Sequence, residues 1–170
     1  MRNTPSILLS FDVEEFDMPL EYGQIIPSEE QVSVGLKGLE KLIPILERYK
    51  TPTTLFTPAF FAQQFPELIR SLSSQHEIGS HTFYHSEFET THLLESKQAL
   101  EEITGKTVYG LRMPRMKKIN LADVKKAGYV YDSSINPTWL PGRYNNLKVS
   151  RTTYIQEGLT ILPASVSPTF

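Results

Sequence analysis

Two histidines, His81 and His85, lie four residues apart in the segment HEIGSHTFYH, directly after a short apolar run. If this segment is helical, both imidazoles point the same way, because an α-helix repeats about every 3.6 residues. Imidazole nitrogens that face one point can bind a divalent metal, usually zinc when the other ligands are nitrogen or oxygen. The chain has no cysteine, so any further ligand must be His, Asp or Glu.

Acidic residues near the N-terminus are the best source of that further ligand. Asp12, Glu14 and Glu15 follow the run Ser6 to Phe11, which is almost wholly apolar and typical of a strand buried on both faces of a parallel sheet. In α/β folds, ligands bind at the carboxyl ends of such strands. We therefore expect these carboxylates to face the two histidines. The alternative is that they are solvated loop charges.

The rest of the pattern predicts strands and helices in alternation. Ser28, with Gln31 three residues later, fits a capping box at the start of a helix, and Pro44 is expected to kink or break that helix. Further helices are expected within 58–74, interrupted at Pro66, and at 93–104 and 120–127. Strands are expected at 6–11, 53–57, 78–80, 108–111, 129–131, 149–154 and 159–162.

This order implies parallel strands joined by right-handed crossovers, and thus an α/β fold. Four expected strands end near a polar residue that can do chemistry, and four in register suggest a barrel-like sheet with one active face. These residues are Asp12, His81, Arg112 and Asp132. Asp132 has a second interpretation, as an Asx-turn residue with Ser133 and Ser134.

Length and charge exclude several classes of protein. A chain of 170 residues predicts a single domain spanning 1–170. The net charge of −2 gives no field that would attract nucleic acid. No apolar run approaches the roughly 18 residues of a membrane span, and no export signal is visible, so we expect a cytoplasmic protein. The sequence does not indicate an oligomeric state.

Four segments, SFDVEE, HEIGSHTFYH, GLRMP and GYVYDSS, occur in this order. Together they resemble the polysaccharide deacetylases of the NodB-homology group, carbohydrate esterase family 4, from Ser6 to about Ser134. The resemblance implies a deformed (β/α) barrel, seven-stranded in the family. It also implies a metal-dependent hydrolase that removes an N-acetyl group from an amino sugar of a saccharide substrate.

The resemblance also implies a role for each matching residue. Asp12 matches the catalytic base, His81 and His85 match the two metal-binding histidines, and Arg112 matches the residue that orients the base. Asp132 lies in the next motif. The chemistry is consistent, because a bound metal, most simply Zn²⁺, polarises an amide carbonyl and lowers the pKa of water, while a carboxylate accepts the proton.

Two departures from the family pattern are visible. Val13 stands where the family has a metal-binding Asp, and Glu14, one position later with a longer arm, is expected to replace it as the third ligand. No histidine follows His92, although the family has a late histidine as general acid. We therefore expect that the C-terminal part of the barrel is missing from this chain.

Two other functions stay open at this stage. Val13 favours a metal-independent ureide or formamide hydrolase of the same fold. Loss of the metal and the general acid would leave a non-catalytic saccharide-binding domain. Phe83, Tyr84 and Trp139 are candidates for a sugar-stacking wall, and they are equally expected in the core. The segments 16–27 and 137–146 are expected to form the walls of the pocket.

Overall fold

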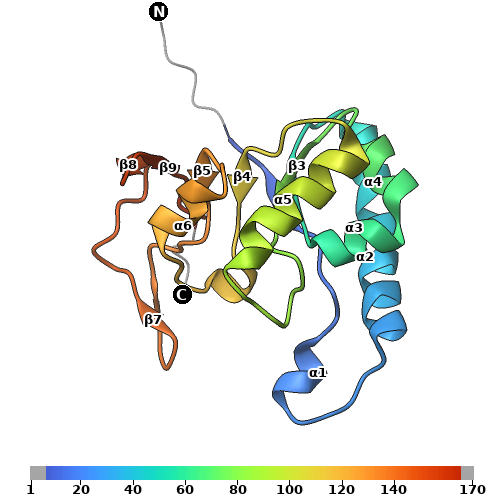
Figure 1. Ribbon diagram of the computed structural model, residues 1–170, viewed down its shortest axis with the longest axis horizontal. Coiled ribbons are helices and arrows are strands. Elements are labelled where there is room, and N and C mark those ends of the chain that lie inside the picture. Colours follow the sequence, from blue (N-terminus) through green and yellow to red (C-terminus); the bar gives the residue numbers. More distant parts are fainter. Residues whose placement is uncertain (1–6, 166–170) are drawn as a thin grey trace, which may run out of the picture.

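The computed structural model describes residues 7–165, which are built around one seven-stranded sheet (Figure 1). Its strands in chain order are β1 (Ser10–Asp12), β2 (Thr54–Thr57), β3 (Glu77–Ser80), β4 (Gly110–Leu111), β5 (Tyr131–Asp132), β8 (Tyr154–Gln156) and β9 (Leu159–Ile161). Across the sheet the order is β1-β2-β3-β4-β5-β9-β8. Every neighbouring pair is parallel except β9 with β8. The predicted α/β fold with a mainly parallel sheet is confirmed.

Helical segments connect the parallel strands from β1 to β5, as the alternating pattern predicts. They are α1 (Met18–Glu21), α2 (Ser28–Tyr49), α3 (Ala59–Gln64), α4 (Pro66–Leu72), α5 (Thr91–Thr104) and α6 (Leu121–Lys126), with a short 3₁₀ turn at Pro114–Met116. In Figure 1, α2 to α5 gather on one side of the molecule, and α1 lies at the tip of a long connection between β1 and α2. None of the helices in 7–165 is long and apolar enough to cross a membrane.

The burial of both faces of the sheet explains why its central strands are continuous apolar segments in the sequence. Leu55 and Phe56 are consecutive in β2 and point to opposite faces, yet they are 0% and 1% exposed. Both faces of β2 are therefore covered, which is usual for a parallel strand. Beside the sheet, α5 packs against α3, α4 and β3.

The capping box expected in α2 is wrong, and of the kink or break expected at Pro44, the break does not occur. Pro44 does not end the helix, which continues to Tyr49. The N-cap residue is Pro27 rather than Ser28, and no side chain caps the first turn, so the capping box does not form. The Gln31 side chain donates instead to the carbonyl of Ile26 at 3.0 Å.

The first strand begins later than predicted. It comprises Ser10–Asp12, whereas Ile7 and Leu8 are 91% and 79% exposed and Ser6 lies outside the described residues. The expectation of a strand buried on both faces is therefore wrong for this run. β1 is an edge strand with β2 as its one neighbour in the described sheet, so it is covered less completely than β2. Its last residue is Asp12.

The chain departs from the parallel pattern after β5. The strands β6 (Trp139–Leu140) and β7 (Tyr144–Asn145) form a separate antiparallel hairpin, which the sequence did not predict as strands. The strand expected at 149–154 is wrong for residues 149–153, since β8 begins at Tyr154, whereas the strand expected at 159–162 is present as β9. β8 and β9 pair with each other as an antiparallel hairpin. Glu157 and Gly158 connect β8 to β9, both with positive φ (53° and 78°), which is typical of a two-residue hairpin turn.

Candidate metal centre

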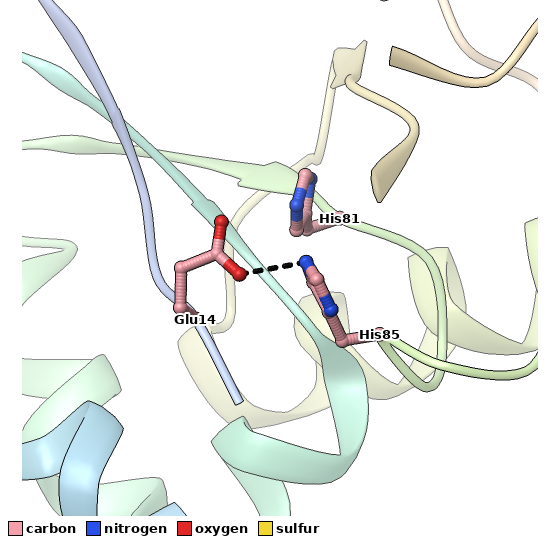
Figure 2. Close-up of side chains that lie close together, drawn as sticks. All are labelled: Glu14, His81 and His85. Atoms are coloured by element: carbon pink, nitrogen blue, oxygen red, sulfur yellow. Dashed lines mark ion pairs between the residues drawn. The ribbon is translucent and has the colours of Figure 1, made fainter. Parts of the chain in front are cut away.

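Three predicted ligands come together at the carboxyl ends of β1 and β3. One ligand atom each of Glu14, His81 and His85 lies within 4.8 Å of the others, and Figure 2 shows the three side chains converging from two segments. The histidines are 1% and 6% exposed, whereas the Glu14 side chain is 53% exposed. The cluster therefore has a buried base of two imidazoles and an open side at the carboxylate.

His81 directly follows β3, and hydrogen bonds fix its position. Its backbone N–H donates to the carbonyl of Thr57 at 3.0 Å, which extends the pairing of β3 with β2. Its Nδ1 lies 2.8 Å from the carbonyl oxygen of Arg112. Because a carbonyl only accepts, Nδ1 must carry the proton, and Nε2 then presents a lone pair. Burial lowers the pKa of His81 to about 4, so the neutral ring is favoured.

The two histidines do not lie on a helix, so that expectation is wrong. Residues 81–85 form an irregular loop, in which Thr82 has a left-handed φ of 65°. The Thr82 N–H donates to Ser80 Oγ at 3.1 Å, and Ser80 Oγ lies 2.9 Å from Ser96 Oγ on α5. This buried hydroxyl pair anchors the loop at its start. The loop brings the two imidazole rings to a centroid separation of 5.3 Å.

His85 contacts a carboxylate at each ring nitrogen. Its Nδ1 lies 2.9 Å from Asp17 Oδ2, and its Nε2 lies 2.7 Å from Glu14 Oε2, close enough for an ion pair but without the alignment of a hydrogen bond. Burial alone would lower the pKa of His85, but the contacts with Glu14 and Asp17 outweigh it and raise the pKa. Asp17, which is 3% exposed, also accepts from Arg115 Nη2 at 2.9 Å. Sequence reasoning missed Asp17, and no pattern in the sequence indicates its contact with His85.

The exposure of the side chains alternates along residues 13–17. Val13, Glu15 and Asp17 are 3%, 4% and 3% exposed, whereas Glu14 is exposed. Val13 belongs to the hydrophobic core, while Glu14, on the other side of the chain, reaches His85. Burial would raise the pKa of Glu14, but the contact with His85 more than offsets this and lowers it.

Gly35 lets the chain of Glu14 lie directly on α2. A Cβ built on Gly35 would be 2.0 Å from the carbonyl oxygen of Glu14, which is far inside van der Waals contact. Only glycine allows this approach, so Gly35 sets the position of the Glu14 backbone.

Glu15 is a buried acid behind the cluster. Its Oε2 accepts the His85 backbone N–H at 3.2 Å, and its Oε1 has no hydrogen-bond partner. Burial raises the pKa of Glu15 to about 7. The side chain thus holds the backbone of His85.

Asp12 and Arg112 form the predicted pair beside the cluster. Arg112 Nη1 donates to Asp12 Oδ1 at 2.8 Å, and the Asp12 side chain is 27% exposed. Three further bonds hold the guanidinium, to Ser10 Oγ at 2.9 Å, Ser133 Oγ at 2.9 Å and the Ser133 carbonyl at 3.2 Å. Its Cζ also lies 4.2 Å from the ring centroid of Phe56. The carboxylate is therefore fixed at one oxygen and open to solvent.

Asp132 does not join the other predicted residues. It is 4% exposed, its Oδ2 accepts the Ser134 N–H at 3.3 Å, and its Oδ1 accepts the Ser134 hydroxyl. These bonds are those of the Asx-turn interpretation. Burial raises the pKa of Asp132. The side chain borders a neighbouring cavity instead of the cavity that Asp12, Glu14 and His85 line.

The expected aromatic wall is divided. Phe83 and Tyr84 pack on each other at a centroid distance of 4.8 Å and also on His92. Trp139 lies on the β6–β7 hairpin and is 58% exposed. The three rings therefore do not form one surface.

The ligand set fits a divalent metal. Nδ1 of His81 faces a carbonyl, so its Nε2 carries a lone pair, and this atom is buried without a hydrogen-bond partner. Nε2 of His85 is also buried, with Glu14 Oε2 at 2.7 Å. Unpartnered buried nitrogens are unfavourable unless a ligand binds them. Two imidazoles and a carboxylate are a common zinc set with room for water at the fourth position.

Similarity to known proteins agrees with the four motifs. Residues 3–131 match the model of the polysaccharide deacetylase family. A peptidoglycan deacetylase of Helicobacter pylori (strain ATCC 700392 / 26695) is 27% identical over 122 residues, which are 64% of this chain and 42% of that protein.

Two solved structures share the fold. A Mycobacterium smegmatis protein assigned to the polysaccharide deacetylases superposes with a TM-score of 0.67 at 24% identity, over 95% of this chain and 58% of that one. The PuuE allantoinase superposes with a TM-score of 0.65 at 20% identity, over 94% and 61%. The chain thus spans about half the length of these proteins. Since the family match covers well over half of its residues, the chain belongs to the polysaccharide deacetylase family.

Proposed function

We propose that this chain carries the catalytic centre of a zinc-dependent hydrolase that removes an N-acetyl group from an amino sugar of a saccharide. Glu14, His81 and His85 would hold the metal, Asp12 would act as the base, and Arg112 would orient Asp12. The expectations of one domain and of a cytoplasmic location stay predictions.

One observation carries the proposal: Nε2 of His81 is buried without any partner, beside Nε2 of His85, whose one polar neighbour is Glu14 Oε2 at 2.7 Å. If the cluster were only structural, we would expect Nε2 of His81 to have a partner, as its Nδ1 does. Family membership adds support, because deacetylation is an amide hydrolysis.

Each side chain around the cluster would have a separate role in the hydrolysis of the amide. When bound, the zinc ion supplies a Lewis acid that polarises the amide carbonyl and makes water more acidic. Asp12 accepts a proton through the oxygen that Arg112 leaves open. Arg112 orients that carboxylate through its hydrogen bond to Oδ1. The buried imidazoles exclude water from one side of the site.

Zinc binding tests the proposal most directly. We expect about one zinc per chain by elemental analysis after loading and desalting, and loss of that zinc in a His81→Ala/His85→Ala variant. His92→Ala is the matched control, since His92 belongs to the same region but not to the cluster. A wild-type chain without zinc, or a His92 variant that also loses it, would refute the metal site. Release of acetate from N-acetylated oligosaccharides then tests the reaction.

A second candidate is a metal-independent ureide or formamide hydrolase with the same fold. Val13, which lies in the core where the family has a metal ligand, is the observation that favours it. A screen for acetate, formate and ammonia separates the two: formate or ammonia release that survives chelation would support the second candidate, whereas chelator-sensitive acetate release supports the first.

A further inference from the structure

Two cavities meet beside the metal centre. One, of about 520 Å³, is lined by Asp12, Glu14 and His85. The other, of about 740 Å³, lies against the segments that follow β4 and β5 and against the β6–β7 hairpin. Both volumes fall in the usual range for small-molecule sites, roughly 300–1,000 Å³. Arg115, Met116 and Arg143 belong to both walls, so a ligand at the metal centre can extend into the larger cavity.

The larger cavity, here the basic cavity, has a wall rich in positive charge. Four basic residues line it, and the one acidic residue is Asp132, whose two oxygens accept from Ser134. The chain as a whole has 19 acidic and 17 basic residues, so this concentration of cations is not a result of composition. The basic residues are Arg115, Lys117, Lys118 and Arg143.

The two lysines are the cations that remain available. Arg115 pairs with Glu21, and Arg143 lies 3.9 Å from the same carboxylate, so both arginines face negative charge. Lys117 and Lys118 are exposed and form no ion pair within residues 7–165. Their charge can therefore act on a ligand in the cavity.

The remaining polar side chains suit a saccharide. Tyr144 and Tyr154 offer rings that can pack on the C–H face of a sugar, and Asn146 and Gln156 offer amides to its hydroxyls. A wall with rings, amides and free ammonium groups fits a sugar that also carries negative charge.

We propose that the basic cavity binds an anionic group, a carboxylate or a phosphate, on the saccharide whose amide lies at the metal centre. The preferred substrate is then an acidic saccharide, and Lys117 and Lys118 determine this specificity. This inference rests on the proposed deacetylase function and adds the charge of its substrate.

The test compares three N-acetylated trisaccharides with one backbone: neutral chitotriose, its aldonic acid, which has a carboxylate at the reducing end, and its 1-phosphate. KM and kcat for acetate release are measured at low salt and in about 0.5 M NaCl, where exposed charges are strongly screened. Lys117→Ala/Lys118→Ala is set against Lys125→Ala/Lys126→Ala, an equally exposed lysine pair on the short helix α6 that does not line the basic cavity.

We expect the wild type to show a lower KM for an anionic saccharide than for chitotriose, and salt to reduce the difference. The 117/118 variant should raise that KM about fivefold with a smaller effect on chitotriose, since each exposed pair contributes modestly. The 125/126 variant should match the wild type. The anionic form with the lower KM identifies carboxylate or phosphate as the group. Equal KM values for all three saccharides, or an equal effect of both variants, would overturn the inference.

Failure of the proposed function gives a different result. In that case the wild type releases acetate from none of the three saccharides. Calorimetric titration with the same saccharides then decides the inference alone: tighter binding of an anionic form that depends on Lys117 and Lys118 supports it, and equal binding refutes it.

Discussion

Asp17 Oδ2 lies 2.9 Å from His85 Nδ1, and the other oxygen of Asp17 accepts from Arg115 at 2.9 Å. The carboxylate is 3% exposed, so both bonds are shielded from water. Asp17 thereby holds the ring of His85 in one orientation, with Nε2 turned toward Glu14. Carboxylates in this relation to a histidine usually strengthen its bond to a metal.

Replacing Asp17 should weaken zinc binding without removing a ligand. We expect Asp17→Asn to lower zinc affinity by about 10- to 100-fold, because the amide can offer Nδ1 of His85 a weaker acceptor. Competition with a chromophoric chelator measures the affinity. Arg115→Met, which removes the bond to the other oxygen of Asp17, is the control. Wild-type affinity in the Asp17→Asn variant would show that the contact with His85 does not position the ligand.

Two glycines of α2 provide a matched pair. Gly35→Ala should displace the Glu14 backbone, because its Cβ would lie 2.0 Å from the Glu14 carbonyl oxygen, and we expect zinc affinity and thermal stability to fall together. Gly38 has no atom within 4 Å of a built Cβ. Gly38→Ala should therefore stabilise the chain by about 0.5–1 kcal/mol, as expected for Gly to Ala within a helix, with zinc binding unchanged.

Thermal unfolding and zinc titration of both glycine variants check this prediction. Circular dichroism establishes whether the Gly35 variant is folded before its affinity is compared. Equal zinc affinity in the two folded variants would show that the backbone at Glu14 can shift without effect on the site.

Arg112 should be irreplaceable by lysine. A lysine ammonium cannot reproduce the planar fork that reaches Asp12, Ser10 and Ser133, so Arg112→Lys leaves buried acceptors unpaired. We expect a loss of about 3 kcal/mol in the free energy of unfolding, measured with urea. Arg70→Lys, at a half-exposed pair with Glu67, should change it by less than about 0.5 kcal/mol. Similar losses at both positions would contradict this account of Arg112.

Tyr129 should make the chain sensitive to alkali. Burial raises the pKa of Tyr129 to about 12, whereas an unfolded tyrosine ionises near 10. Above about pH 10 the unfolded chain binds fewer protons than the folded chain, so the stability is complete below that pH and is lost toward pH 12. Tyr129→Phe should reduce this slope in urea unfolding between about pH 9 and 11. It should also cost about 1 kcal/mol at neutral pH, because the bond to the Leu93 carbonyl is lost. An unchanged slope would contradict the prediction.

The sequence predicted which side chains cluster more accurately than it predicted the backbone that carries them. Spacing alone brought His81 and His85 together, but through an assumed helical turn. The observed loop depends on Thr82 with φ of 65°, a conformation that β-branched residues rarely adopt and that no local pattern indicates. Tertiary bonds to Ser80 and Ser96 hold it, and these connect residues distant in sequence.

On the carboxylate side of the site, too, some residues were predicted from the sequence and others were missed. The longer arm of Glu14 led us to expect it in place of a ligand at Val13, and the structure places Glu14 next to His85. Asp17 was missed because its partner lies 68 residues away. In the sequence, Gly35 is one more residue of an expected helix. Only the structure shows that the carbonyl of Glu14 lies against it. Contacts of this kind between distant segments leave no periodic signal.

The hydroxyl pair of Ser80 and Ser96 has a consequence for the zinc-free protein. The Thr82 amide proton points at Ser80 Oγ in a fully buried position, so its exchange with deuterium requires the loop to open. Slow exchange at Thr82 without metal would mean that the histidines are already in place. Zinc would then bind a rigid, preformed site with little ordering of the chain. A zinc-finger domain, in contrast, folds only when it binds its ion.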